Sequence, residues 1–111
     1  IQQCLMNLVF NAMEAMPDGG KLTLSTSFKR KNRMVHIDIS DTGYGIPEEN
    51  LSQLFTPFFT TKTGGEGTGL GLYLVLEIIK EHDGCILVEN RSEGGSQFLI
   101  WLPIAKEDCL R

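Results

Sequence analysis

A chain of 111 residues is long enough for one domain around a single hydrophobic core and too short for two. Ten Lys and Arg against 14 Asp and Glu give a net charge of −4, which argues against general nucleic-acid binding because that activity needs a basic surface. No apolar run approaches the roughly 20 residues that span a bilayer. Three cysteines without a CxxC pair argue against a disulfide framework and against zinc, so Cys4 and Cys85 are expected as free thiols in or near the core.

Residues 1–16 have the pattern of an amphipathic helix that is already under way at Ile1, with apolar residues at three- and four-residue spacing. At about 100° per residue, Asn7, Asn11 and Glu14 fall in a narrow arc on the opposite side. A solvated surface is the ordinary explanation of such an arc. The alternative is a magnesium site, because Asn is a weak helix former and its carbonyl is a hard oxygen ligand.

Two alternating segments follow, at residues 22–28 and 35–39, and the basic run at 29–33 joins them as a solvated hairpin loop. DTGYGIP at 41–47 is predicted to form a turn, after which Pro47 begins a short helix with acidic residues in its first turn. Asp41 has two open interpretations: it caps this turn, or it accepts a hydrogen bond from a heterocyclic amine.

Residues 55–72 include five glycines and lead into a predicted helix at 69–83, which Gly84 ends. Glycines before a helix N-terminus are typical of phosphate sites, although a mobile surface loop is the alternative. Inward positions are predicted at Leu70, Leu74, Val75, Ile78 and Ile79. A last hairpin pairs residues 85–90 with 96–102, and residues 105–111 form a polar tail.

This order of elements predicts an α/β fold: a two-layer sandwich in which helices cover one face of a mixed, mainly antiparallel sheet. We assign residues 1–104 to that domain. His36 and His82 are expected in structural positions, on a polar strand face and at a helix C-terminus respectively.

Four sequence motifs follow one another along the chain: NLVFNAMEAMP at 7–17, DTGYGIP at 41–47, FTPFFTTK at 55–62 and GTGLGL at 67–72. They resemble the N box, first glycine box, F box and second glycine box of the ATP-binding catalytic domain of bacterial two-component sensor histidine kinases. The resemblance covers nearly the whole chain, which would start within the N-box helix. It implies the Bergerat ATP-binding fold and a protein-histidine kinase domain that uses ATP and Mg²⁺.

The resemblance also implies roles for individual residues. Asn11 would coordinate Mg²⁺ and Asp41 would hold the adenine amino group. The catalytic residues implied are Asn7, Asn11, Glu14 and Lys62. The implied nucleotide-binding residues are Asn11, Asp41, Gly43, Gly45, Ile46, Phe58, Lys62, Gly67, Thr68, Gly69, Leu70 and Gly71.

Asn7 occupies the position where the gyrase and heat-shock ATPases of this superfamily carry a Glu that activates water. An amide cannot act as a general base, so we expect little intrinsic ATP hydrolysis; Glu14, in the same arc, is the alternative base. The phospho-accepting histidine is not among the 111 residues.

The implied partners are therefore ATP, a histidine-containing dimerisation domain of the same parent protein acting in cis or in trans, and indirectly a response regulator. Binding to nucleic acid and direct contact with a membrane are not expected. A cytoplasmic location is expected. Two other functions remain open, namely a degenerate nucleotide-binding module for protein contacts and an anti-sigma-type serine kinase.

Overall fold

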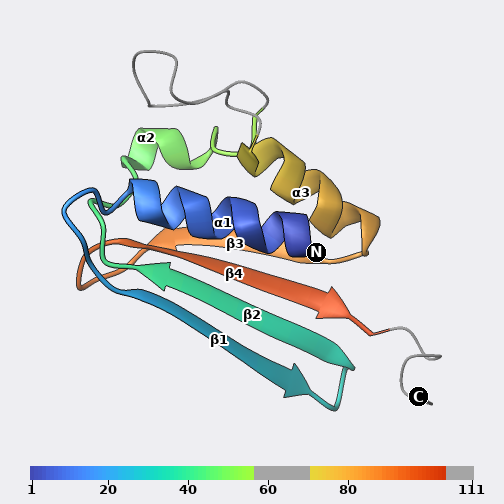
Figure 1. Ribbon diagram of the computed structural model, residues 1–111. Helices are drawn as coiled ribbons and strands as arrows, with labels where there is room; N and C mark the ends of the chain where they lie inside the picture. The colour runs from blue at the N-terminus through green and yellow to red at the C-terminus, as the bar shows by residue number, and fades with distance from the viewer. Residues whose placement is uncertain (57–70, 105–111) are drawn as a thin grey trace.

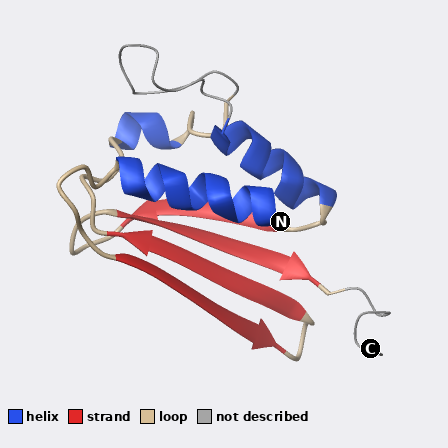
Figure 2. Cartoon of the chain, viewed as in Figure 1, coloured by secondary structure: helices blue, strands red, loops and turns tan. Residues whose placement is uncertain are grey.

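The computed structural model describes residues 1–56 and 71–104, which form two layers, helices above a sheet (Figures 1 and 2). The helices are α1 (Gln2–Glu14), α2 (Glu48–Leu51) and α3 (Gly71–Glu81). The strands are β1 (Leu22–Lys29), β2 (Met34–Asp41), β3 (Cys85–Asn90) and β4 (Ser96–Pro103). The predicted two-layer α/β sandwich is confirmed. Most of the glycine-rich segment at 55–72, which is predicted to bind phosphate, lies outside the described residues. Leu70 and the predicted tail at 105–111 also lie outside them.

The four described strands lie in the order β1-β2-β4-β3, and every neighbouring pair is antiparallel. The parallel component of the expected mixed sheet is therefore not found among these strands. Strand β4 inserts between β2 and β3, and Ser40 near the end of β2 pairs with Gln97 near the start of β4. This pairing brings the end of β2 beside the β3–β4 hairpin, although the two are far apart in sequence.

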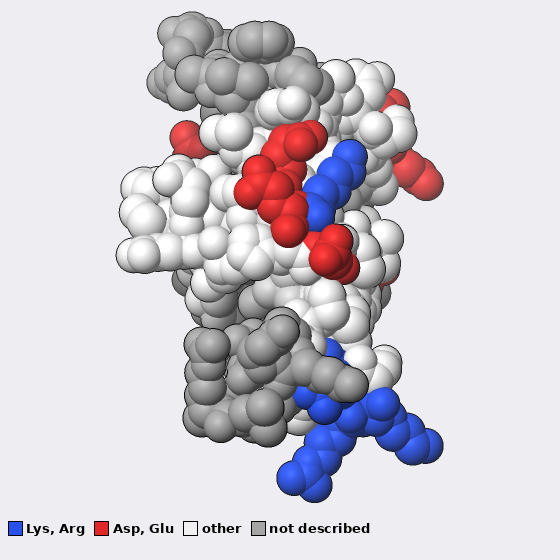
Figure 3. All heavy atoms as spheres, turned by 90° about the vertical axis from the view of Figure 1, so that its right-hand side faces the viewer, with Lys and Arg blue, Asp and Glu red and all other residues white. Residues whose placement is uncertain are grey.

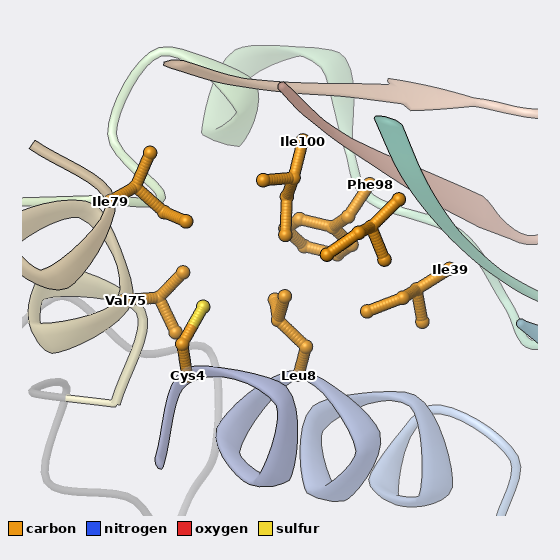
Figure 4. Close-up of a cluster of buried hydrophobic side chains, with 8 residues drawn as sticks. Cys4, Leu8, Ile39, Val75, Ile79, Phe98 and Ile100 are labelled. Carbon is orange, nitrogen blue, oxygen red and sulfur yellow. The ribbon is translucent and has the colours of Figure 1, made fainter. Parts of the chain in front are cut away.

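The core lies between the helices and the inner face of the sheet (Figure 4). Helix α1 contributes Cys4 and Leu8, and α3 contributes Val75 and Ile79 at a spacing of one helical turn. The sheet contributes the alternate residues of β2 and β4 that point upward, which are Ile37, Ile39, Phe98 and Ile100. Full burial of one such side chain contributes about 1.5–3 kcal/mol, so these residues fix the helices over the centre of the sheet.

Three predictions of detail are wrong. Cys85 is exposed, because it pairs with Trp101 and both point to the open face, whereas Ile86 pairs with the buried Ile100. Leu74 is 44% exposed, because it lies on a flank of α3 while Val75 and Ile79 point into the core. Pro47 immediately precedes α2 instead of being its first residue. Cys4, in contrast, is buried as predicted.

Both histidines have the structural positions expected of them. The Nδ1 atom of His36 lies 3.1 Å from the carbonyl oxygen of Ile100, and its ring packs on Trp101 with centroids 4.8 Å apart. The Nδ1 atom of His82 lies 2.9 Å from the carbonyl oxygen of Ile78.

Positive charge gathers on the β1–β2 hairpin, visible as the blue group at the bottom of Figure 3. This hairpin lies at the opposite end of β2 from Asp41, so about 25 Å of strand separates them. Among the residues that the structure describes, no helix is both long and apolar enough to cross a membrane.

Candidate functional site

A cavity of about 600 Å³ opens at the end of the sheet where β2 ends and β4 begins. The C-terminal half of α1, the loop after β2 and the β3–β4 hairpin enclose it. Its lining residues are Asn11, Glu14, Ala15, Tyr44, Gly45, Ile46, Pro47, Leu54, Asn90, Arg91, Gly94, Gly95 and Ser96. A volume of this size suits a small organic ligand such as a nucleotide.

The loop at residues 41–47 is held against the end of α1. The Tyr44 N–H donates to the Ala15 carbonyl over 3.3 Å, and Gly43 lies so close to the same carbonyl that a side chain there would collide with it. The missing side chain of Gly43 thus makes room for α1, whereas Gly45 and Ile46 line the cavity. This packing of the loop on α1 explains why Asn11 and Glu14 line the same cavity as the loop.

Asp41 is 2% exposed and is not among the described lining residues, but it is hydrogen-bonded to Ser96, which lines the cavity. Its Oδ1 atom accepts from the Gly43 N–H at 2.8 Å and from the Ser96 N–H at 3.3 Å, while Oδ2 accepts from the Ser96 hydroxyl at 2.7 Å. Asp41 therefore caps its own turn, which was one of the two interpretations. A carboxylate offers about four acceptor sites, so Oδ2 retains one for a further donor.

The polar arc of α1 is divided between two locations. Asn11 and Glu14 line the cavity, as their shared side of the helix predicts. Asn7, one turn earlier, is not in the described lining and instead donates from Nδ2 to the Gly71 carbonyl over 3.3 Å. That hydrogen bond ties α1 to the first residue of α3.

Asn90, Arg91 and Ser96 belong to the site but were not predicted from the sequence. Asn90 and Arg91 lie at the end of β3, where nothing in the local sequence separates them from ordinary hairpin residues. The strand alternation of β4 could have indicated Ser96, because Ser96 shares the inward face with Phe98 and Ile100. A polar group on that face needs a buried hydrogen-bond partner. That partner is Asp41.

Arg91 joins the hairpin to the end of β2. Its Nη1 donates to the Asp41 carbonyl over 3.1 Å, and its Nη2 lies 3.1 Å from a carboxylate oxygen of Glu93. The Ser92 hydroxyl bond, assisted by a backbone hydrogen bond and by the charge of Arg91, lowers the pKa of Glu93 below its usual value. The guanidinium is thus one positive group at the cavity wall.

Several predicted site residues lie outside the described residues: Phe58, Lys62, Gly67, Thr68, Gly69 and Leu70. Within the part that is described, no group of three or more His, Cys, Asp or Glu side chains could hold a metal. The oxygen atoms of Asn11 and Glu14 are nevertheless the hard ligands that Mg²⁺ prefers, and Mg²⁺ commonly takes only one or two protein ligands beside phosphates and water. The cavity therefore fits a magnesium ion that arrives with a phosphate ligand.

The chain is similar in sequence and in fold to known kinases. Sporulation kinase C of Bacillus subtilis (strain 168) is 42% identical over 107 residues, covering 96% of this chain and 24% of that protein. The nucleotide-free catalytic domain of histidine kinase ThkA has a TM-score of 0.78 and 40% identity, covering 91% of this chain and 65% of that one. Full-length ShkA in complex with AMPPNP has a TM-score of 0.80 and 27% identity, covering 93% and 21% respectively.

The chain thus spans about a quarter of the curated relative's length. Residues 1–106 match the sequence family described as "Histidine kinase-, DNA gyrase B-, and HSP90-like ATPase". Together with the sandwich and the cavity, this match shows that the chain belongs to the histidine kinase-, DNA gyrase B- and HSP90-like ATPase family.

Proposed function

We propose that this chain binds Mg-ATP in the cavity between α1 and the β3–β4 hairpin and donates the γ-phosphoryl group to a histidine on another domain. The observation that carries the proposal is the arrangement of Asp41, whose buried carboxylate keeps one acceptor site beside a nucleotide-sized cavity. An adenine amino group would donate to that site. Guanine carries a carbonyl at the corresponding position and would leave the buried carboxylate without a donor.

Asn11 would hold the magnesium ion from α1, with Glu14 beside it. When bound, Mg²⁺ offsets the negative charge of the phosphates and orients them. Lys62 and the glycines at 67, 69 and 71 remain candidates for the phosphate contacts, on the resemblance of their motif alone. The relative ShkA was solved in complex with AMPPNP, which supports a nucleotide as the ligand.

Transfer is favoured over hydrolysis because Asn7 has no basic group. Its amide instead bonds to the Gly71 carbonyl, so it supports the packing of α1 on α3. We predict that the unaltered protein releases phosphate slowly and that Asn7→Glu increases the release. Rapid release by the unaltered protein would contradict this assignment, and Glu14→Gln would then test the alternative base.

The phospho-acceptor is proposed to be a histidine-containing dimerisation domain of the same parent protein, reached in cis or in trans, with a response regulator as the next acceptor. The proposed location of the reaction is the cytoplasm, where ATP is available. The names of two relatives, sporulation kinase C and histidine kinase ThkA, support kinase activity.

A phosphotransfer assay tests the proposal: the protein is incubated with labelled ATP, Mg²⁺ and a separate histidine-containing domain. We expect acid-labile phosphate on that domain, lost in Asn11→Ala. Acid-stable phosphate would favour the serine kinase, and nucleotide binding without any transfer would favour the protein-contact module.

A further inference from the structure

The side chain of Asn90 makes two hydrogen bonds to one residue of the opposite wall. Its Oδ1 accepts from the Ile46 N–H at 2.8 Å, and its Nδ2 donates to the Ile46 carbonyl at 2.7 Å. The two residues are 44 positions apart. One amide side chain thus pairs with both backbone groups of Ile46, much as a neighbouring strand would.

Gly45, the residue before Ile46, lies close to the Asn90 side chain. A side chain at Gly45 would approach Oδ1 of Asn90 to 3.1 Å, and Gly45 has a φ of +77°, which glycine adopts without strain. Asp, Ser and Ala cannot replace the pair of bonds: Asp lacks the donor, Ser is too short to span both groups, and Ala lacks both polar atoms.

We propose that Asn90 is a positioning residue that sets the base-binding wall of the cavity. It would act through the Ile46 backbone, because its Oδ1 and its Nδ2 both bond to that residue. Arg91, its neighbour, holds the other end of the same loop at the Asp41 carbonyl. The β3–β4 hairpin therefore fixes the loop at both ends, and this determines where a base lies relative to the Asp41 carboxylate. The inference rests on the proposed function.

The test compares the dissociation constants of ADP and GDP, each with Mg²⁺, by calorimetry. Loss of two ordinary hydrogen bonds from the wall predicts about tenfold weaker ADP binding in Asn90→Ala. GDP lacks the donor for Asp41 and is expected to change less, so the preference for ADP over GDP falls. Asn90→Asp keeps the size and the acceptor but sets an oxygen against the Ile46 carbonyl, and is expected to lower the preference as well.

The matched control is Asn32→Ala, an exposed asparagine in the β1–β2 hairpin at the far end of β2. It is expected to leave both constants unchanged. A purely structural role of Asn90 would weaken both nucleotides equally, and that result, or an unchanged preference in both Asn90 variants, would overturn the inference. If the unaltered protein binds neither nucleotide, the proposed function itself fails.

Discussion

Asp41→Asn removes one buried charge next to the cavity while keeping the shape of the side chain. The amide oxygen can still accept from the N–H groups of Gly43 and Ser96, and the amide nitrogen can donate to the Ser96 hydroxyl, so the fold should survive. The position that accepts the adenine amine becomes a donor. A hydrogen bond to a charged group contributes about 1.5–3 kcal/mol, which corresponds to roughly 10- to 150-fold in affinity.

The control is Asp38→Asn, on the same strand but on the open face of the sheet. The Asp38 carboxylate accepts from Ser40 Oγ at 3.0 Å and from Gln97 Nε2 at 2.7 Å, so Asp38→Asn alters a similar set of side-chain bonds and removes the same charge. Calorimetric titration with Mg-ADP should show the loss in Asp41→Asn only. Equal affinity in both variants, or an equal loss in both, would refute the assignment of Asp41 to the base.

Three further predictions concern the fold that carries the site. Leu8→Ala empties a fully buried position and should lower the free energy of unfolding by about 2–5 kcal/mol in a denaturant titration; a change below about 1 kcal/mol would contradict the core described above. Gly95→Ala should destabilise far more than Gly94→Ala, because both residues have positive φ but only Gly95 lies against the Asp41 backbone; equal losses would contradict this contact. Iodoacetamide at pH 8 should modify the exposed Cys85 within minutes and the buried Cys4 only on unfolding. Burial raises the pKa of the Cys4 thiol above its ordinary value of 9.0, so the native state holds that proton more tightly. The stability from this group therefore declines as the pH rises above that value. A Cys4 that reacts as fast as Cys85 would show that helix α1 is not packed as described.

The order of elements and the two layers could be predicted because each segment has a clear period. Helix α1 repeats its apolar residues at helical spacing, and β2 and β4 alternate, so their inward faces follow directly. The error at Cys85 arises where residue type outweighs the strand period. Cysteine is commonly buried, which predicts an inside position, but the alternation of β3 points Cys85 to the open face.

The site was predicted as far as its residues lie in compact motifs. Asn11, Glu14 and the loop at 41–47 come together as their spacing indicated. Asn90 and Ser96 could not be found in the same way, because their partners Ile46 and Asp41 become neighbours only through the pairing of β2 with β4. A contact that depends on strand order leaves no local pattern in the sequence.

Hydrogen–deuterium exchange with and without Mg-AMPPNP tests the central claim most directly, because it reports both binding and its location. We predict slower exchange in the loop at 41–47 and at residues 90–96, which enclose the cavity, with no change in the basic hairpin at 29–33. Unchanged exchange throughout, or protection confined to the hairpin, would contradict the proposal that this cavity binds ATP.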